Sequence, residues 1–319
     1  MAESIRDEGE ATFAACGGAR SAAGANPPLP PWLKVKIRKR QLARATRDVL
    51  HEVGVHTVCE EARCPNIGEC FSCGTATFLI MGPNCTRHCR FCAVHSARPL
   101  PLDPEEPKRV AQAAARLKLR HVVVTSVTRD DLPDGGAGHF AATCAAIRKA
   151  LPQATVELLI PDCRGDAAAL ETIFAARPDV LNHNLETVRR LTPRVRPEAD
   201  YDRSLRVLRL ADRWRREHGA PMLLKSGLMV GLGETFDEVL QALEDMRATG
   251  CEMVTVGQYL RPSPAHLPVA RYVPPEEFGE IERAAREMGF KFVAAGPFVR
   301  SSYRAAEAVA QSARAKEER

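Results

Sequence analysis

Seven of the chain's eleven cysteines lie between residues 59 and 92, where six of them form two closely spaced triplets. The spacings are C-x4-C-x5-C and C-x3-C-x2-C, formed by Cys59, Cys64 and Cys70 and then by Cys85, Cys89 and Cys92. Thiolates this close together converge only around zinc, an iron–sulfur cluster or disulfides. Structural zinc usually takes four protein ligands, often as two C-x2-4-C pairs, which neither triplet supplies. A cubane cluster held by three cysteines keeps one iron open, so the second triplet predicts a cluster that binds a small molecule there.

The residues around the second triplet fit a cluster held at the end of a strand. The apolar run 78–81 predicts a strand, and residues 82–84 predict the turn that follows it. Arg87, His88 and Arg90 place positive charge beside an anionic cluster. Zinc and a set of unrelated reduced thiols remain as alternatives to the cluster. Two triplets within one short stretch make unrelated thiols the weaker of these alternatives.

From residue 76 onward, strand-like runs alternate with amphipathic helical stretches. The expected strands are 78–81, 121–127, 156–160, 180–184, 223–230 and 253–256, and residues 290–295 can add another. The expected helices are 107–118, 140–150, 166–175, 201–218, 237–248 and 275–288. This alternation predicts an α/β fold with a parallel sheet and right-handed crossovers. Six such units predict a barrel-like sheet short of the full eight.

Upstream of this pattern we expect a helix over residues 38–53, ended by Gly54, and then an irregular loop over residues 59–73. The first residues are rich in Ala, Gly, Pro and acidic side chains without a period, which is typical of a disordered tail. We therefore divide the chain into a tail (1–31), an N-terminal extension with the first triplet (32–75), a barrel (76–295) and a C-terminal extension (296–319).

Polar or glycine-rich residues follow each expected strand. In sheets of this kind the site lies at the carboxyl ends of the strands, so these residues are expected to converge. The candidates are Asp130, Asp131, Asn184, Glu186, Gly231, Glu234 and Tyr259. Ordinary polar surface loops are the alternative for the whole set. Asp130 and Asp131 also fit helix or turn caps, and His183 fits a structural residue.

Two stretches carry a resemblance to a known family. CTRHCRFC resembles the signature of radical S-adenosylmethionine enzymes, and CEEARCPNIGEC resembles the auxiliary-cluster motif of lipoyl synthases. Further matching stretches extend from residue 31 to residue 304 and include TSVTRDDLPDGG, NHNLETV, KSGLMVGLGET, GQYLRPS and GPFVRSSY. The resemblance implies a partial (β/α)6 TIM-like barrel of the radical SAM type. N- and C-terminal extensions would cover its mouth, with Arg300 and Tyr303 bracing the cover.

The resemblance also implies two [4Fe–4S] clusters and S-adenosyl-L-methionine. The second triplet would hold the cluster that binds S-adenosylmethionine, and the first would hold the auxiliary cluster. The family's fourth auxiliary ligand is a serine of the R-S-S-Y motif; we assign it to Ser302, with Ser301 and a plain backbone cap as alternatives. Cys73 departs from the family motif, and its spacing from Cys70 is also that of a ligand. The expected contacts to S-adenosylmethionine are Asp130, Asp131, Asn184, Glu186, Gly231, Glu234 and Tyr259, with Arg196 or Lys225 at its carboxylate.

The implied reaction inserts sulfur at C6 and C8 of an octanoyl chain on a protein lysine, and the sulfur comes from the auxiliary cluster. The implied partners are octanoylated lipoyl carrier domains (2-oxoacid dehydrogenase acyltransferase subunits and the glycine cleavage H protein), a flavodoxin or ferredoxin reductant, and an iron–sulfur carrier protein. Two rivals are an RNA methylthiotransferase, for which no room remains for a second RNA-binding domain, and a zinc-stabilised binding module, which leaves the barrel pattern unexplained.

Composition favours a cytoplasmic monomer. Eleven cysteines in 319 residues are too few for a disulfide scaffold, so reduced thiols are expected. No apolar run approaches the length of a membrane span, and no secretory or transit signal is apparent. The net charge of +5 does not call for nucleic acid. Basic residues concentrate in stretch 32–47, which is either a solvated helix face or a docking face for an acidic partner.

Overall fold

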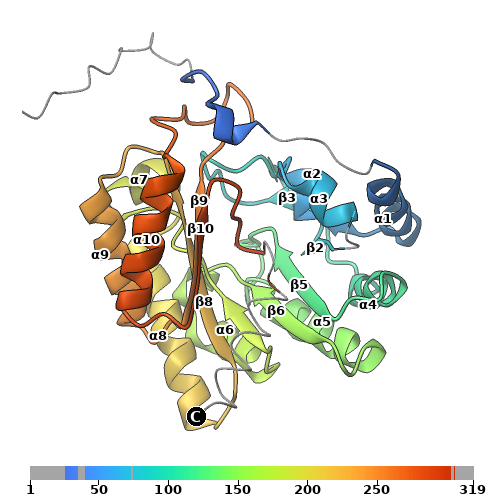
Figure 1. The fold of residues 1–319 in the computed structure, drawn as a ribbon. Helices are drawn as coiled ribbons and strands as arrows, with labels where there is room; N and C mark the ends of the chain where they lie inside the picture. The colour runs from blue at the N-terminus through green and yellow to red at the C-terminus, as the bar shows by residue number, and fades with distance from the viewer. Residues whose placement is uncertain (1–25, 35–39, 73–74, 303–304, 306–319) are drawn as a thin grey trace, which may run out of the picture.

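The computed structural model describes residues 26–34, 40–72, 75–302 and 305. Within these residues an eight-stranded sheet runs in the order β1-β2-β5-β6-β7-β8-β9-β10 (Figure 1). Neighbouring strands from β2 to β10 pair in parallel, and β1 pairs with β2 antiparallel. The strands are β1 (His56–Thr57), β2 (Thr77–Ile80), β5 (His121–Ser126), β6 (Thr155–Leu159), β7 (Val180–Asn182), β8 (Leu223–Val230), β9 (Met253–Gln258) and β10 (Phe292–Gly296).

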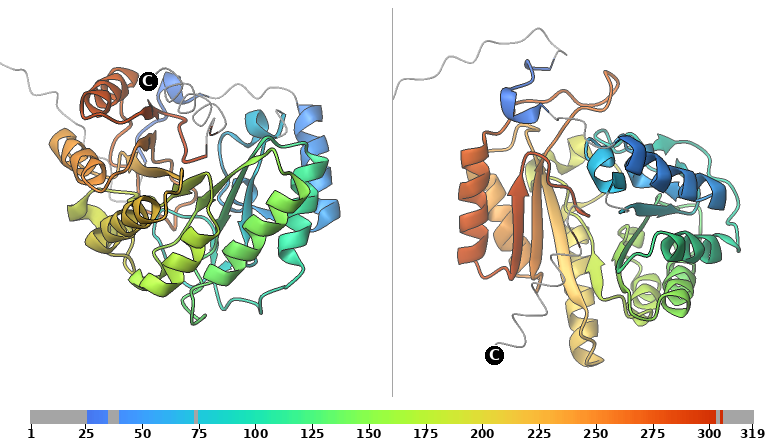
Figure 2. Two further views of the ribbon diagram at one scale, coloured as in Figure 1. Left: turned by 90° about the horizontal axis from the view of Figure 1, so that it is seen from below. Right: turned by 45° about the vertical axis from the view of Figure 1, so that its right-hand side comes forward.

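Helices connect the consecutive parallel strands and cover the outer face of the curved sheet (Figure 2). They are α4 (Glu106–Arg116), α5 (Ala137–Ala150), α6 (Ala167–Ala175), α8 (Tyr201–Glu217), α9 (Phe236–Arg247) and α10 (Pro275–Glu287). The sheet stays open, because β1 and β10 are its two ends in the described part of the chain. The predicted partial barrel is confirmed, and β10 is the additional strand expected near residues 290–295.

Local sequence explains where these elements begin and what they bury. Val122, Val123 and Val124 of β5 are all buried, because helices cover one face of the sheet and the barrel interior fills the other. Three of the connecting helices, α6, α8 and α9, begin at side-chain caps. Asp166 caps α6, and Thr235 caps α9 in a reciprocal capping box with Glu238.

The interior of the barrel contains a buried ion pair. Lys225 Nζ of β8 donates to both carboxylate oxygens of Glu157 on β6, at 2.9 and 3.2 Å. Asn182 of β7 donates to the same carboxylate at 3.0 Å, and His121 Nε2 of β5 lies 3.3 Å from it. Burial by itself would raise the pKa of Glu157, but the charge of Lys225 and the hydrogen bond from His121 hold that pKa at about 2. The pair therefore remains ionised inside the sheet.

The first cysteine motif is more ordered than expected. The irregular loop predicted over residues 59–73 is wrong for most of its length, because it contains α2 (Val58–Glu61) and α3 (Ile67–Ser72). Thr57 caps α2 by accepting a hydrogen bond from the backbone of Glu60. Phe71 of α3 is fully buried, and its carbonyl accepts a 2.6 Å hydrogen bond from Thr46 of α1 (Arg40–Val53). These tertiary contacts stabilise helices too short to be predicted from periodicity.

Several expectations lie outside the described residues. These are most of the tail (1–25), the first two residues of the helix expected over 38–53, Cys73 and Tyr303. The remaining elements are η1 (Pro31–Leu33), β3 (Asn84–Cys85), β4 (His95–Ser96), η2 (Cys163–Gly165), η3 (Arg189–Leu191) and α7 (Thr192–Val195). Among the described helices, none has the length and apolar character required to cross a membrane.

Candidate active site

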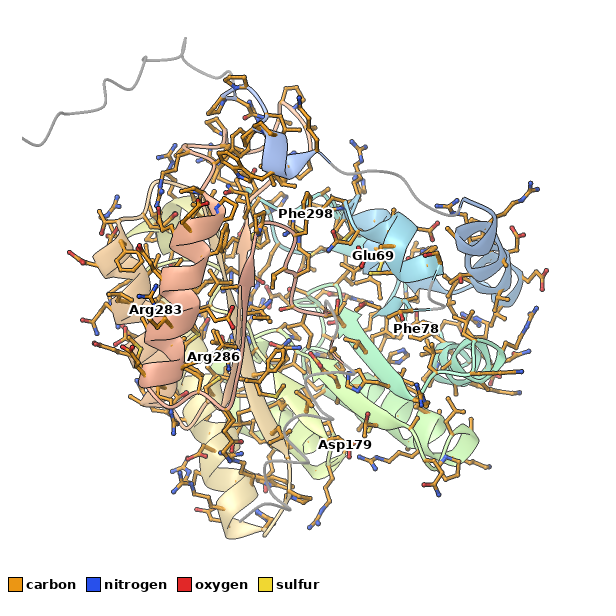
Figure 3. All side chains as sticks on the ribbon, viewed as in Figure 1. Glu69, Phe78, Asp179, Arg283, Arg286 and Phe298 are labelled. Carbon is orange, nitrogen blue, oxygen red and sulfur yellow. The ribbon has the colours of Figure 1, made fainter. Side chains whose placement is uncertain are left out.

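The N-terminal and C-terminal extensions meet over the carboxyl ends of the strands. Asn66 Nδ2, just before α3, donates a 2.6 Å hydrogen bond to the carbonyl of Phe298 in the segment after β10. Figure 3 places Phe298 and Glu69 toward the same end of the molecule and Asp179, which precedes β7, toward the other. The C-terminal segment passes so close to β9 that a Cβ added to Gly257 would lie 2.1 Å from the carbonyl oxygen of Val299. The two extensions therefore cover the barrel mouth, as expected.

The second cysteine triplet follows β2 and lies beside the carboxyl end of β5. Cys85 Sγ accepts hydrogen bonds from the backbone of Arg87 at 3.5 Å and of Thr128 at 3.3 Å. Burial, with a smaller contribution from the neighbouring Cys85, raises the pKa of Cys89 to about 11 and that of Cys92 to about 12. Thiols buried this way become thiolates only when a metal ion compensates the charge. The three cysteines are half-buried, and they lie close together, since Cys85 influences the pKa of both Cys89 and Cys92. Three thiol donors from one loop suit a cubane cluster.

The first cysteine triplet is held by α2, α3 and the turn between them. The backbone of Cys64 donates to the carbonyl of Cys59 at 3.0 Å, and the backbone of Cys70 donates to that of Asn66 at 2.9 Å. Burial, opposed by the contact with Thr77 and aided by the nearby Cys64, raises the pKa of Cys59 to about 11. The donors are again thiols, so the set fits an iron–sulfur cluster.

The two serines of the C-terminal motif point to different groups. Ser302 Oγ accepts a 2.8 Å hydrogen bond from Thr77 Oγ1, and Thr77 also contacts Cys59. Ser301 Oγ instead donates a 2.8 Å hydrogen bond to Asn184 Oδ1, beyond the end of β7. Ser302 therefore lies beside the first triplet, and Ser301 lies beside the residues that follow β7.

Asn184, Glu186 and Arg196 form one group close to the second triplet. Asn184 Nδ2 donates a 3.0 Å hydrogen bond to Glu186 Oε1. Burial raises the pKa of Glu186, and the charge of Arg196 opposes that shift. Arg196 donates through one terminal nitrogen to the carbonyls of Asn184 and Leu185, at 3.2 and 3.1 Å. Its Nε is buried without a hydrogen-bond partner among the described residues, which leaves one donor available to a ligand.

Asp130 and Asp131 have arginine partners. Arg87, between the first two cysteines of the second triplet, donates two hydrogen bonds to Asp130, at 2.7 and 3.0 Å. Arg87 also donates at 2.7 Å to Asp162, which is fully buried and accepts another 2.7 Å hydrogen bond from Arg203. Asp131 is exposed and accepts two 2.9 Å hydrogen bonds from Arg129. The Arg87 network fixes the cysteine loop to the segments after β5 and β6.

The other expected contacts are engaged in the protein's own structure. Lys225 is paired with Glu157 in the barrel interior. Glu234 accepts hydrogen bonds from the backbone of Gly231 and Leu232, at 2.5 and 3.0 Å, and so closes its own loop. Tyr259 is buried, and its hydroxyl donates to the carbonyl of Leu267 at 2.8 Å.

Thr77 and Arg203 contribute to the site without having been expected from the sequence. Thr77 lies within a buried strand, where threonine is common, and no motif signals its contacts with Cys59 and Ser302. Arg203 lies on α8 and resembles the other arginines of that helix. Both become apparent only from contacts between segments distant in sequence.

Comparison with known proteins gives consistent results. The family model for the Radical SAM superfamily matches residues 79–246. A lipoyl synthase from Caldanaerobacter subterraneus subsp. tengcongensis is 56% identical over 276 residues, covering 86% of this chain and 95% of that protein. A lipoyl synthase from Thermus thermophilus is 56% identical over 278 residues, covering 86% and 85% of the two chains.

Solved structures are similar at the level of the fold. HydG, a maturase of the [FeFe]-hydrogenase, matches with a TM-score of 0.53 at 14% identity, over 84% of this chain and 66% of that one. SuiB of Streptococcus suis, bound to its precursor peptide SuiA, matches with a TM-score of 0.53 at 11% identity, over 79% and 52% of the two chains. At such identities these matches support the architecture alone.

Proposed function

The chain belongs to the lipoyl synthase family of the Radical SAM superfamily, and from this premise we propose which of its residues perform each part of the reaction. The enzyme inserts two sulfur atoms, at C6 and C8, into a protein-bound octanoyl chain. It uses S-adenosylmethionine and a [4Fe–4S] cluster, and an auxiliary cluster supplies the sulfur. Membership in this family sets aside the RNA methylthiotransferase and the zinc-stabilised binding module.

Cys85, Cys89 and Cys92 are the proposed ligands of the cluster that binds S-adenosylmethionine. When bound, that cluster supplies the electron for reductive cleavage of the sulfonium and hence the radical that removes hydrogen from the substrate. The protein's own contribution is to hold the cysteine loop, and hence the cluster, in place. The backbone of Thr128 and the Arg87–Asp130 pair hold the loop against the strand ends.

Cys59, Cys64, Cys70 and Ser302 are the proposed ligands of the auxiliary cluster. The observation that carries this assignment is the position of Thr77, which contacts Cys59 and donates a hydrogen bond to Ser302. A serine oxygen is a harder ligand than a thiolate and a poorer match for iron. Ser302 would therefore hold its iron weakly, which suits a cluster whose role is to supply sulfide.

Arg196, Asn184 and Glu186 are the proposed contacts to S-adenosylmethionine. Arg196 is favoured over Lys225 as the residue that binds the carboxylate of S-adenosylmethionine. Its Nε has no partner among the described residues, whereas Lys225 is paired with Glu157. The Asn184–Glu186 pair suits ribose hydroxyls. Asp130, Gly231, Glu234 and Tyr259 would act indirectly, through the loops that they hold.

The partners and the division of the chain remain part of the proposal. We propose a cytoplasmic monomer that acts on acyltransferase and glycine cleavage H carrier domains, receives electrons from flavodoxin or ferredoxin, and has its auxiliary cluster rebuilt by an iron–sulfur carrier protein. The basic N-terminal stretch would contact the acidic carrier. The division into residues 1–31, 32–75, 76–295 and 296–319 is supported by β2, whose first residue, Thr77, follows the second boundary.

Iron and acid-labile sulfide per chain test the two-cluster assignment. The wild type and a Cys85→Ala/Cys89→Ala/Cys92→Ala variant would be reconstituted anaerobically and compared. A fall from about eight irons to about four is expected if each triplet holds one cubane. A fall from about four to none would mean that the first triplet holds no cluster, and the sulfur-donor assignment would then be wrong.

A further inference from the structure

We infer that the surface around His88, on the outer side of the barrel mouth, is the docking site of the one-electron donor protein, and that the partner presents an acidic face to it. The inference rests on the proposed function, because it takes the second triplet as the ligands of the cluster that must be reduced. It adds the surface through which the electron arrives and the kind of protein that docks there.

The cysteine loop approaches solvent at one place. Among the residues between Cys85 and Cys92, only His88 and Arg90 are exposed, and both are direct neighbours of Cys89. The side chain of His88 is 71% exposed. Electron tunnelling weakens steeply with distance, so the peptide bonds on either side of Cys89 offer the shortest route from the surface to the proposed cluster.

The other approaches to this loop are closed by protein. On its inner side, Arg87 is buried in ion pairs with Asp130 and Asp162. At the barrel mouth, the C-terminal segment is tied down through Ser301 and Ser302. The mouth must also admit S-adenosylmethionine and the octanoyl chain, so a donor protein that docked there would compete with the substrates.

Cationic side chains surround the exposed part of the loop. Arg194 is exposed and precedes Val195, whose carbonyl accepts a 2.9 Å hydrogen bond from the backbone of Arg90. Arg206 of α8 lies against the turn that contains Arg164, since a Cβ added to Gly165 would be 2.6 Å from its guanidinium. We call His88, Arg90, Arg164, Arg194 and Arg206 the His88 surface.

The carboxylates on the same surface, Glu198, Asp200 and the exposed Asp166 that caps α6, are fewer than its four arginines. Glu198 lies 3.2 Å from the ring of His88, and Asp200 caps α8 by accepting a 2.6 Å hydrogen bond from the backbone of Arg203. Arg164 lies 3.3 Å from Asp130, a carboxylate already bonded twice by Arg87. The side chains of Arg194 and Arg206 form no hydrogen bond or ion pair within the described residues. The His88 surface is thus cationic and complements an acidic partner.

A cationic face suits a brief encounter with an acidic protein. Electron-transfer complexes bury little area and are steered by complementary charge, so that the partner can leave after each electron. In each encounter the donor is oxidised by one electron and the cluster is reduced by one. The enzyme consumes such an electron for each S-adenosylmethionine that it cleaves, so rapid exchange of the donor benefits turnover.

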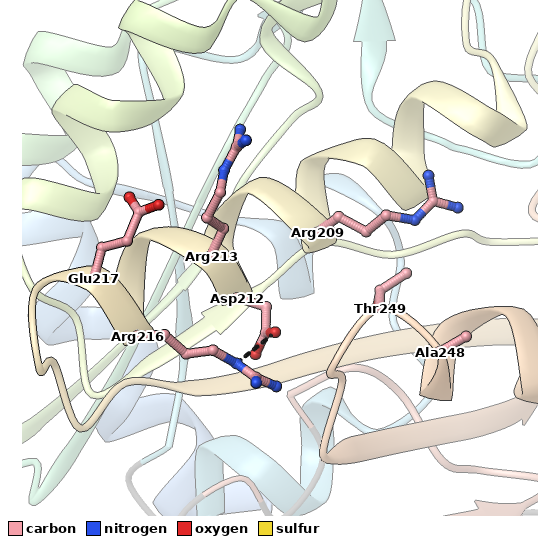
Figure 4. Close-up of a pocket in the computed structure, with 7 residues that line it drawn as sticks. All are labelled: Arg209, Asp212, Arg213, Arg216, Glu217, Ala248 and Thr249. Carbon is pink, nitrogen blue, oxygen red and sulfur yellow. Dashed lines mark ion pairs between the residues drawn. The ribbon is translucent and has the colours of Figure 1, made fainter.

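The same helix provides a matched control at the opposite end of the barrel. Figure 4 shows Arg213 and Arg216 on α8 beside a cavity of about 420 Å³ that is also lined by Thr249, which follows α9 and precedes β9. These arginines are exposed, like Arg206, but lie toward the amino ends of β8 and β9. Reversing their charge changes the net charge of the enzyme equally and leaves the His88 surface intact.

The test compares wild type, Arg194→Glu/Arg206→Glu and Arg213→Glu/Arg216→Glu, each reconstituted with both clusters. Reduced flavodoxin is the probe, and bleaching of the cluster absorbance is followed by stopped flow at low ionic strength. We expect the rate constant of Arg194→Glu/Arg206→Glu to fall about tenfold or more, and the control to stay within about twofold of wild type. The difference should shrink as salt is added. Titration calorimetry with oxidised flavodoxin should show the same order of affinities.

Dithionite, a small reductant that needs no docking surface, separates the possible outcomes. All three proteins should form 5′-deoxyadenosine from S-adenosylmethionine at the same rate with dithionite. The inference would be overturned if Arg194→Glu/Arg206→Glu lost as much activity with dithionite as with flavodoxin. It would also be overturned if the control variant were slowed as much with flavodoxin, or if neither variant were slowed. A raised KM for the octanoylated carrier with unchanged reduction by flavodoxin would assign the surface to the carrier instead. If the wild type formed no 5′-deoxyadenosine with dithionite, the proposed function itself would be wrong.

Discussion

Thr77 Oγ1 donates a 2.8 Å hydrogen bond to Ser302 Oγ, although the two residues are 225 positions apart in the chain. Thr77 also contacts Cys59. One buried threonine therefore connects the first cysteine of the N-terminal motif with the second serine of the C-terminal motif. If both are ligands of the auxiliary cluster, Thr77 would stabilise the serine oxygen as an alkoxide by a charge-assisted hydrogen bond.

The first prediction separates the two serines. Ser302→Ala should abolish formation of the lipoyl product but retain cleavage of S-adenosylmethionine, because it removes a ligand of the sulfur-donating cluster alone. Ser301→Ala should retain the product, since its hydroxyl contacts only Asn184 among the described residues. Mass spectrometry of the carrier and chromatography of 5′-deoxyadenosine measure the two activities. Loss of the product in Ser301→Ala with retention in Ser302→Ala would reverse the assignment.

The second prediction concerns the carboxylate of S-adenosylmethionine. Arg196→Gln should raise the KM for S-adenosylmethionine about tenfold or more, because a charge-assisted hydrogen bond to the cofactor is lost. Arg190→Gln is the control: Arg190 is exposed and pairs with Glu238 on the surface, where ion pairs contribute little. Steady-state formation of 5′-deoxyadenosine over a range of cofactor concentrations gives both KM values. An unchanged KM in Arg196→Gln would remove Arg196 from the site.

The third prediction uses a glycine beside Asn184. A Cβ at residue 227 would lie 2.7 Å from Thr255 Oγ1 and 3.0 Å from Asn184 Oδ1, so Gly227→Ala must displace one of these side chains. We expect roughly a ten- to hundredfold loss of kcat/KM for S-adenosylmethionine. Gly279→Ala on α10 is the matched control, because no atom lies within 4 Å of its added Cβ. Its activity should be unchanged and its Tm equal or slightly raised. Equal activity in both variants would contradict a role for Asn184.

The fourth prediction concerns stability. Lys225→Met leaves the carboxylate of Glu157 buried without its lysine and should lower the free energy of unfolding by about 3–5 kcal/mol. Glu157→Gln/Lys225→Met removes both charges and should recover most of that loss. Anaerobic urea unfolding of the two variants and the wild type measures these differences. A double variant no more stable than the single one would mean that the pair has another role.

The fifth prediction gives the pH dependence of the same pair. The pKa of Glu157 is about 2 in the folded protein, against an ordinary value of 4.5. A carboxylate with a lowered folded pKa stabilises the protein fully above its ordinary pKa, and this contribution disappears as the pH falls from about 4.5 toward about 2. Glu157→Gln/Lys225→Met should therefore lose less stability than the wild type below about pH 4.5. Urea unfolding at a series of pH values measures this difference. If the two proteins lost the same stability as the pH falls, Glu157 would not be the cause of the loss.

The sequence by itself determined the elements of the barrel and the two cysteine triplets. The expected strands and helices correspond to β2 and β5–β10 and to their connecting helices, because apolar period and side-chain caps are local properties of the chain. The cysteine triplets could also be predicted from the sequence, because the ligands of one cluster often come from one loop and are therefore closely spaced. The same local rules missed α2 and α3, whose stability comes from burial of Phe71 rather than from periodicity.

Only the tertiary structure decided which polar groups are free to act. Asp130, Lys225 and Arg196 were all expected to contact S-adenosylmethionine, but Arg87 and Glu157 pair with the first two, whereas Nε of Arg196 remains unpartnered in the described structure. Ser301 and Ser302 are adjacent and chemically identical, but Ser301 contacts Asn184, which follows β7, and Ser302 contacts Thr77 of β2. These differences arise from hydrogen bonds between segments far apart in sequence. Periodicity and spacing describe near neighbours only, so the folded chain alone determines which of two similar residues faces each cluster.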